Sequence, residues 1–397
     1  MPPSIVRRIL PDFRGLPRPF WVLFVGTLVN RVGGFVLIFL AIYLTEVRGL
    51  SAAQAGVVIS AYGLGAIGGG PLGGALSDRI GRRPILATSL IAGGASMLML
   101  GLATETPAIM AAAGVTGFFY EMYRPVVSAT IADTVGPDDL PRAYGLIYWA
   151  VNLGASIAPL LGGLVAARSY RALFAVDAGT TALCGVIVWM ALPETRPANP
   201  APGRAAWNGV RVILGDGVFL AVCVLNFAFS IVFFQSFVGL PLDMRAHGIS
   251  PAGFGGVIAL NGVLIVLLQP LAVDLIQNRP RALTLAVASL LLAAGFGMNA
   301  WVGSAAGYAV SVTIWTLAEI LYVPAAMSVV AGLAPADLRG AYQGAFALAF
   351  TAAFAAAPAA GGYVIAHAGA RWLWIGSLAV GSAIAVCFFG LRRSRIH

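Results

Sequence analysis

The sequence is poor in charged residues, histidine and cysteine, and it contains no lysine. Only 10% of its 397 residues are charged, whereas a soluble domain carries about a quarter. A chain that is 59% hydrophobic could not cover its own surface in water, so the soluble classes of protein are excluded. Cys184, Cys223 and Cys387 stand far apart inside apolar segments, which excludes a disulfide framework and a zinc cluster.

Catalytic signatures are also missing. The three histidines, His247, His367 and His397, lie far apart at the ends of apolar segments, and the chain has no HExxH motif and no Walker loop. An enzyme needs a cluster of nucleophile, base or metal ligands. We therefore expect no enzymatic activity and no metal site. The competing classes are a membrane-embedded enzyme, a receptor and a simple channel. Measurement of ligand flux in a reconstituted system would distinguish a transporter from them.

Long apolar runs are what the chain has in abundance. A bilayer core of roughly 30 Å needs about 20 apolar residues per helix, and twelve runs reach that length. The predicted fold class is therefore all-α and integral to the membrane, with twelve transmembrane helices. The runs are 20–44, 51–76, 84–103, 106–132, 142–167, 171–192, 217–241, 251–276, 282–302, 304–333, 341–366 and 370–391.

All the positive charge is arginine, and the formal net charge is +9. In a soluble protein such an excess would suggest nucleic acid as a partner. If the N-terminus lies inside, the inside segments hold 17 arginines and the outside segments 5, which matches the positive-inside rule. We predict a multi-pass protein of the cell (plasma or inner) membrane with both termini cytoplasmic, whose partner is the lipid bilayer and not nucleic acid.

The longest polar stretch divides the chain almost at its middle. It predicts an N-terminal six-helix bundle over 1–192, a cytoplasmic linker over 193–216 and a C-terminal six-helix bundle over 217–397. Within the linker, 207–214 is predicted to form a short interfacial helix.

The two halves repeat each other at a constant offset of 199 positions. Chance is a poor explanation, because prolines and a turn align without a gap. Two copies of one bundle with a site between them are an architecture of secondary transporters that work by alternating access. The matching pairs include Gly56 and Gly255, Pro71 and Pro270, Arg82 and Arg281, Pro125 and Pro324, and Pro159 and Pro358.

The loop after the second run, GGALSDRIGRRP at 73–84, resembles the loop 2–3 signature of the major facilitator superfamily. The resemblance implies a cytoplasmic gating motif that locks one state of the transport cycle. It also implies a relay of charge to an acid on the fourth helix, for which Asp133 is the candidate. The motif residues are Gly74, Asp78, Arg79, Gly81, Arg82 and Arg83.

The fifth run, GLIYWAVNLGASIAPLLGG at 145–163, resembles the antiporter signature of the same family, with an alanine where the family usually has glycine. Small residues on one face allow tight helix packing. The resemblance implies export by antiport, and it extends to the twelve-helix drug–proton antiporter branch, near multidrug exporters of the MdtH kind. The signature residues are Gly145, Gly154, Ala158, Pro159, Gly162 and Gly163.

Four ionisable residues stand near the middle of their spans: Arg31, Glu121, Arg124 and Glu319. Such residues are costly in a bilayer unless they are paired or hydrated, which makes them functional candidates. Burial favours a neutral carboxyl and an approaching arginine favours a charged one. We predict Glu319 or Glu121 as the proton carrier, with Arg31 and Arg124 as modulators and possible substrate contacts. The alternative for Glu121 and Arg124 is a static ion pair.

Asp177 is a weaker candidate, for which its position on the sixth run favours a structural role. Aromatic side chains near the same depth suggest an apolar pocket for amphipathic or cationic small molecules: Tyr123, Trp149, Phe233 and Trp315. The predicted function is proton-coupled export of drugs or similar compounds, with the proton as coupling ion and no other cofactor. The alternative is a proton symporter that takes up peptides or another small metabolite. The family leads us to expect a monomer.

Overall fold

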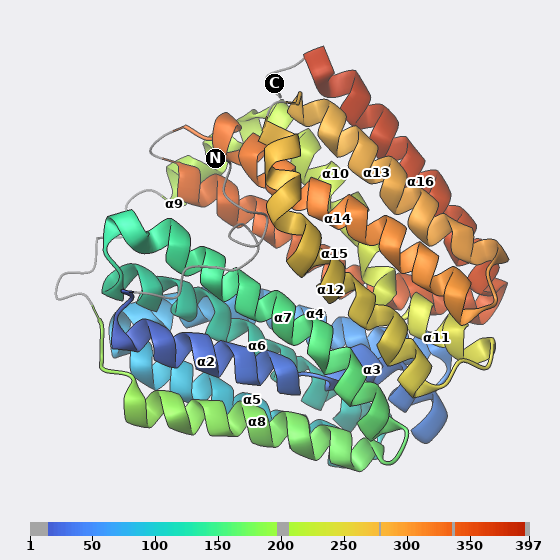
Figure 1. Ribbon diagram of the computed structural model, residues 1–397, viewed down its shortest axis with the longest axis horizontal. Helices are drawn as coiled ribbons and strands as arrows, with labels where there is room; N and C mark the ends of the chain where they lie inside the picture. Colours follow the sequence, from blue (N-terminus) through green and yellow to red (C-terminus); the bar gives the residue numbers. More distant parts are fainter. Residues whose placement is uncertain (1–14, 197–205, 278, 336–337, 394–397) are drawn as a thin grey trace, which may run out of the picture. The chain divides into compact units, whose positions relative to one another are not determined.

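The computed structural model describes residues 15–196, 206–277, 279–335 and 338–393, without the side chains of 206–209, 270–277 and 393. His397 lies outside these ranges. Every regular element in the described part of the chain is a helix (Figure 1). This confirms the predicted all-α fold class.

Ten long helices match predicted runs closely. Within the described residues, eleven helical stretches are long and apolar enough to cross a membrane. The predicted run 106–132 forms a further helix of 29 residues, which contains Glu121 and Arg124 and is not among these eleven stretches. The ten helices are α4 (Ala52–Ile80), α5 (Arg82–Leu102), α6 (Thr106–Thr134), α7 (Leu140–Ala166), α8 (Tyr170–Ala191), α12 (Pro251–Gln277), α13 (Arg281–Gly297), α14 (Ala305–Leu333), α15 (Arg339–Ala368) and α16 (Ala370–Gly390).

The first and seventh predicted runs are not continuous helices, which corrects the prediction. The first consists of α2 (Arg18–Gly33), α3 (Val36–Ile42) and the π-helical turn η1 (Tyr43–Val47). The seventh consists of α10 (Gly217–Phe233), the 3₁₀ turn η3 (Phe234–Ser236) and α11 (Gly239–Ala246). The two α-helices end at equivalent places of the repeat, since Gly34 matches Phe233 at the offset of 199. Hydropathy does not show such breaks, because the residues that flank both of them are mostly apolar.

Asp177 of α8 supplies a hydrogen-bond acceptor at the break between α2 and α3. Its buried carboxylate accepts the backbone N–H of Val36 at 2.9 Å, where α3 begins. It also accepts the hydroxyl of Tyr120 at 2.7 Å. A backbone N–H without a partner would be costly inside a bilayer. Asp177 therefore has the structural role that the sequence favoured.

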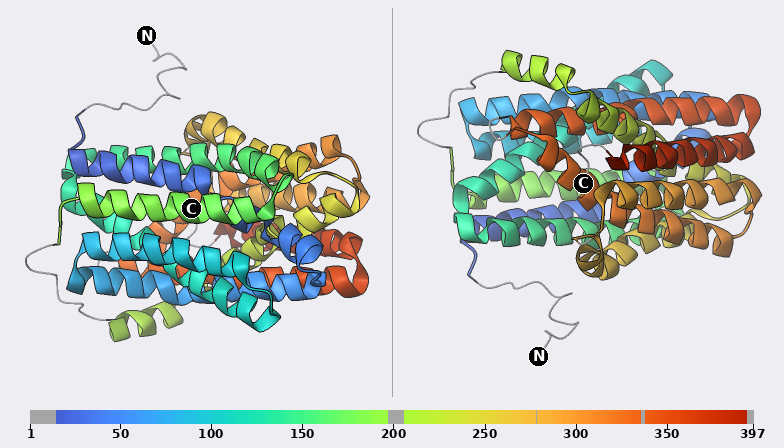
Figure 2. Two further views of the ribbon diagram at one scale, coloured as in Figure 1. Left: turned by 90° about the horizontal axis from the view of Figure 1, so that it is seen from below. Right: turned by 90° about the horizontal axis from the view of Figure 1, so that it is seen from above.

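The chain divides into two compact units. Unit 1 comprises Met1–Leu50, Val57–Pro200 and Ser250–Val266, and unit 2 comprises Ser51–Gly56, Ala201–Ile249 and Leu267–His397. In unit 1, α5 packs on α6 and α8, and α2 packs on α7; these helices run along a common direction (Figure 2). In unit 2, α13 packs on α14 and α16, and α10 packs on α15.

The core of unit 1 lies where α2, α5, α6, α7 and α8 meet, and it contains Phe20, Leu86, Val126, Leu146 and Val188. The predicted domain boundary at 193–216 stays a prediction. Within that stretch a helix, α9 (Ala206–Gly215), is present, which covers the short helix predicted over 207–214.

The internal repeat reappears as two equivalent helix crossings, one in each unit. In unit 1, a Cβ on Gly255 of α12 would collide with the carbonyl oxygen of Pro159 on α7. In unit 2, a Cβ on Gly56 of α4 would collide with the carbonyl oxygen of Pro358 on α15. At the offset of 199, Gly56 matches Gly255 and Pro159 matches Pro358. The shared glycines and prolines thus mark places where helix backbones touch.

Candidate functional site

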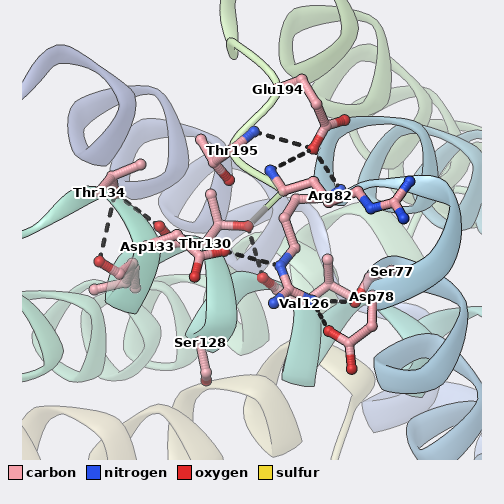
Figure 3. A network of polar contacts seen from close by, with 12 residues as sticks. Ser77, Asp78, Arg82, Val126, Ser128, Thr130, Asp133, Thr134, Glu194 and Thr195 are labelled. Carbon is pink, nitrogen blue, oxygen red and sulfur yellow. Dashed lines mark hydrogen bonds and ion pairs between the residues drawn. The ribbon is translucent and has the colours of Figure 1, made fainter. Parts of the chain in front are cut away.

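Arg82 is the centre of a polar network that joins three helix ends of unit 1 (Figure 3). The residue is buried, with 6% of its surface exposed. Its guanidinium donates from Nε to Asp133 Oδ2 at 2.9 Å and from an Nη atom to Ser77 Oγ at 2.7 Å. The same Nη atom forms an ion pair with Asp78. The structure therefore brings Asp78, Arg82 and Asp133 together at the ends of α4, α5 and α6.

Glu194 is a member of this network that the sequence analysis missed. Its carboxylate accepts the backbone N–H groups of Arg82 at 2.8 Å and Arg83 at 3.3 Å, as Figure 3 shows for Arg82. A carboxylate there satisfies unpaired donors of the first helical turn and complements the helix dipole. The signal in the sequence is an acid directly after the sixth run, but nothing local indicates that it reaches α5.

The glycines and outer arginines of the loop have distinct roles. Gly81 has a φ of +128°, which disfavours side chains, and a Cβ there would collide with the Glu194 carboxylate. A Cβ on Gly74 would meet nothing within 4 Å, so packing does not require a glycine there. The Arg83 guanidinium lies over the ring of Trp189 at 4.5 Å, and Arg79 is exposed.

The segment of α7 that resembles the antiporter signature forms a tight helix interface in unit 1. A Cβ on Gly154 would collide with Arg31 of α2, and a Cβ on Gly162 would lie 2.8 Å from Phe35. A Cβ on Gly163 would lie 2.8 Å from the carbonyl oxygen of Pro251 on α12. Ala158 and Pro159 are buried in α7 as well, whereas a Cβ on Gly145 would meet nothing within 4 Å.

Three of the four predicted midplane charges meet in unit 1. An Nη atom of Arg124 lies 3.4 Å from both carboxylate oxygens of Glu121, one helical turn earlier. The Arg31 guanidinium interacts electrostatically with both of them. The side chains of Arg124 and Glu121 are 57% and 29% exposed. The ion pair is long and both side chains are partly exposed, which leaves room for another charged group to approach it.

The aromatic candidates of unit 1 are held inside the bundle. Tyr123 is buried, and its hydroxyl lies 2.8 Å from Thr27 Oγ1. The Trp149 ring stacks on Phe24, with 6.5 Å between ring centroids.

The remaining candidates belong to unit 2. Glu319 is half-buried on α14, one turn after Trp315 and on the same helix face. Trp315 is buried between Phe233, whose ring approaches edge-on at 5.7 Å, and Phe296, whose ring stacks at 5.5 Å. Glu319 thus stands next to an aromatic stack in its own unit.

The described ranges contain no metal cluster among the candidate residues. No group of three or more His, Cys, Asp or Glu side chains there is placed to hold a metal ion. A hollow of about 270 Å³ between α5 and α6 is lined by small and apolar residues, such as Met99, Ala108 and Val115, and contains none of the candidate residues.

Comparison with known proteins places these features in a family. The model of the Major Facilitator Superfamily matches residues 23–358. The uncharacterized MFS-type transporter YttB of Bacillus subtilis is 25% identical over 90% of this chain and 91% of its own length. A Na(+), Li(+), K(+)/H(+) antiporter of Planococcus maritimus is 27% identical over 79% of this chain and 81% of its own. The multidrug resistance protein MdtH of Salmonella typhimurium is 24% identical over 78% of this chain and 77% of its own length.

Solved structures show the same fold at lower identity. The peptide transporter POT in complex with sulfate is 17% identical, with a TM-score of 0.79 over 99% of both chains. A point mutant of the nucleoside transporter NupG is 13% identical, with a TM-score of 0.83 over 94% of this chain and all of its own. At these identities the likeness concerns the fold alone.

Proposed function

The chain belongs to the Major Facilitator Superfamily, and on that basis we propose that this multi-pass membrane transporter is a proton-coupled antiporter. It exports small amphipathic compounds, drugs among them, in exchange for protons by alternating access. The contact between Gly154 and Arg31 carries the proposal, because it joins the antiporter-like segment to the charge cluster. The relative named as a Na(+), Li(+), K(+)/H(+) antiporter supports exchange as the mode of transport, and the relative named as a multidrug resistance protein supports drugs as substrates.

The charge cluster of unit 1 supplies a way to couple protons to a substrate. Arg124 lies 3.4 Å from the Glu121 carboxylate, and Arg31 stands in the same cluster of charges. A cationic substrate that binds Glu121 competes with a proton for the same oxygens, which is the basis of the proposed exchange. We assign the main proton-carrying role to Glu319, which stands on α14 beside Trp315, and a second one to Glu121.

Transport in proteoliposomes tests the proposal. The acidic compartment is the lumen, and ethidium, a lipophilic cation, is the external probe. Antiport accumulates the dye in the acidic lumen as protons leave, and E319Q is expected to abolish this accumulation. E105Q is the matched control, because Glu105 is an exposed residue at the start of α6.

Three other outcomes would change the assignment. Full proton-driven accumulation by E319Q removes Glu319 from the mechanism, and the same result for E121Q removes Glu121. If a dipeptide instead leaves the acidic lumen together with protons, the protein is a symporter. If only Na⁺ or K⁺ exchanges for protons, the substrate is an inorganic cation.

Topology and assembly complete the proposal. The arginine distribution supports a topology with both termini in the cytoplasm and the network around Arg82 at the cytoplasmic face of the cell membrane. There Asp78, Arg82 and Asp133 act as a gating lock, which Glu194 supports from the end of α8. The transporter works as a monomer.

A further inference from the structure

A buried carboxylate in unit 2, Asp243, has polar partners that belong to no part of the site described above. Asp243 of α11 is 5% exposed. Its neighbours Tyr308 of α14 and Trp374 of α16 are fully buried. The fourth member, His247, follows one helical turn after Asp243, and its side chain is 42% exposed. The group therefore extends from the interior of the unit to its surface.

The contacts form a continuous chain of hydrogen bonds. Tyr308 Oη donates to Asp243 Oδ2 at 2.8 Å, and Trp374 Nε1 donates to the same oxygen at 2.8 Å. His247 Nδ1 lies 3.0 Å from Tyr308 Oη, 2.9 Å from the Asp243 backbone oxygen and 3.5 Å from Asp243 Oδ1. Because the Tyr308 hydroxyl donates its hydrogen bond to Asp243, the Tyr308 oxygen is available as an acceptor for His247 Nδ1.

This arrangement decides the tautomer of the neutral histidine. Nδ1 faces acceptors only, so it carries the proton. Nε2 is then the nitrogen with a free lone pair, on a side chain that reaches solvent. His247 can accept a proton at its outer nitrogen while its inner nitrogen already holds one against Tyr308.

We propose that His247, Tyr308 and Asp243 form a proton relay that loads and unloads Asp243, a proton-binding site of the transporter besides Glu319 and Glu121. A hydronium ion protonates His247 Nε2 and leaves as water. The Nδ1 proton passes to the Tyr308 oxygen as the Tyr308 hydroxyl proton passes to Asp243 Oδ2. The result is a neutral histidine protonated at Nε2, an unchanged tyrosine and a protonated Asp243. Reversal of the same steps releases the proton.

The titratable groups that face the Asp243 carboxylate are its relay partners Tyr308 and His247. The other titratable groups near the end of α11 are directed elsewhere: Arg245 donates to the backbone oxygen of Ile249 at 2.6 Å. His367 of α15 and Arg371 of α16 are exposed. Glu319 stands roughly three turns further along α14 than Tyr308.

Protonation of Asp243 would change how α11 is held. The carboxylate joins α11 to α14 through Tyr308 and to α16 through Trp374, and α11 follows the break at η3. Hydrogen bonds to a carboxylate are stronger than those to a neutral carboxyl. A proton on Asp243 therefore loosens α11, which connects proton binding to movement of the broken seventh span. This link to transport rests on the proposed proton coupling, whereas proton binding by Asp243 does not.

Infrared difference spectroscopy tests the site independently of transport. Acid-minus-neutral spectra are recorded on the purified transporter in lipid, for the wild type, D243N, E319Q and E121Q. We expect a protonated-carboxyl band that D243N loses and the other two variants keep. A D243N spectrum that keeps every carboxyl band of the wild type would overturn the proposal. If transport is insensitive to pH but the Asp243 band is present, the proposed antiport fails and the relay stands.

Stopped-flow pH jumps test the relay and leave Asp243 in place. The signal is the tryptophan fluorescence change that W374F removes, since Trp374 Nε1 bonds to the carboxylate. H247Q and Y308F are expected to slow this change roughly tenfold or more, the size of effect that loss of a positioned proton donor produces. H367Q is the matched control, because His367 Nδ1 makes the same contact with the backbone oxygen four residues earlier, at 2.9 Å. Equal rates in H247Q and H367Q would contradict the relay.

Discussion

Arg82 shows how a single residue can hold several helix ends of one unit together. It lies buried between two carboxylates, Asp78 and Asp133, while its backbone N–H bonds to a third, Glu194. A buried arginine is strongly destabilising when its partners are removed, because its charge is then left without compensation. The network thus stabilises unit 1 and, as proposed, gates the transporter.

Removal of one partner of Arg82 tests the network. D133N removes a charge-assisted hydrogen bond from a buried arginine, and we expect a loss of about 1–3 kcal/mol in the free energy of unfolding. Thermal unfolding of the purified transporter measures the loss. D138N is the control, since Asp138 is exposed in the loop after α6. Equal stability of the two variants would show that Asp133 does not support Arg82.

Gly81 offers a second test at the same place. G81A combines an unfavourable φ of +128° with a collision against Glu194, and we expect it to cost about 1–3 kcal/mol. Gly136 is the matched control: its φ is −61° and a Cβ there would meet nothing within 4 Å. If G136A is as destabilised as G81A in the same unfolding measurement, the conformational explanation is wrong.

At the scale of single helices, the two broken spans and the glycine-lined crossings are the main features. The breaks end α2 and α10 at equivalent places of the repeat, but different side chains support them. Asp177 accepts the first backbone N–H of α3. Gln235 of η3 instead donates to the backbone oxygen of Ala357 at 3.0 Å. The repeat keeps the geometry of the spans, whereas the polar contacts have diverged between the halves.

Replacement of Asp177 separates a structural role from proton carriage. Asparagine keeps an oxygen for the N–H of Val36, so D177N is expected to retain proton-driven transport. D177A leaves that N–H and the Tyr120 hydroxyl without their acceptor and is expected to lose about 1–3 kcal/mol of stability. Dye accumulation and thermal unfolding are the two measurements. Loss of proton coupling in a stable D177N protein would instead make Asp177 a proton carrier.

The crossing of α7 and α12 is tested by adding one methyl group. G255A forces a Cβ against the carbonyl oxygen of Pro159, and overpacking of this kind costs about 1–3 kcal/mol. G256A, one residue later, places its Cβ where nothing lies within 4 Å. G56A is expected to match G255A, because it is the equivalent position in the repeat. A difference in unfolding temperature between G255A and G256A is the readout, and its absence would argue against a tight crossing.

At the scale of the whole molecule, arginine distribution predicts the orientation. A reporter that is active only in the cytoplasm is expected to work when it is fused after residue 397. A reporter that is active only outside is expected to work when it is inserted at Glu105, in the exposed turn before α6. The opposite pattern would invert the topology and place the Arg82 network at the outer face.

The local features of the chain were predictable. The apolar runs, the repeat at 199 positions and the all-helical class follow from hydropathy and spacing, and the helices of the structure agree with them except at the breaks in the first and seventh runs. The loop and antiporter-like motifs were also visible, because their residues stand close together in the chain. Even Glu121 and Arg124 were predictable neighbours, since three positions on a helix place them on one face.

The contacts between distant positions were not predictable. Asp177 bonds to a residue 141 positions away, Glu194 to one 112 positions away, and Trp374 reaches Asp243 across 131 positions. A hint existed for the last group, since Asp243 and His247 have helical spacing, but nothing local indicates Tyr308 or Trp374 as partners. The sequence by itself determined the apolar spans, the duplication and the family, because the spans and motifs depend on neighbouring residues and the duplication on one constant offset along the chain. Only the tertiary structure decided where helices break and which carboxylates have partners, because these depend on side chains that packing brings together.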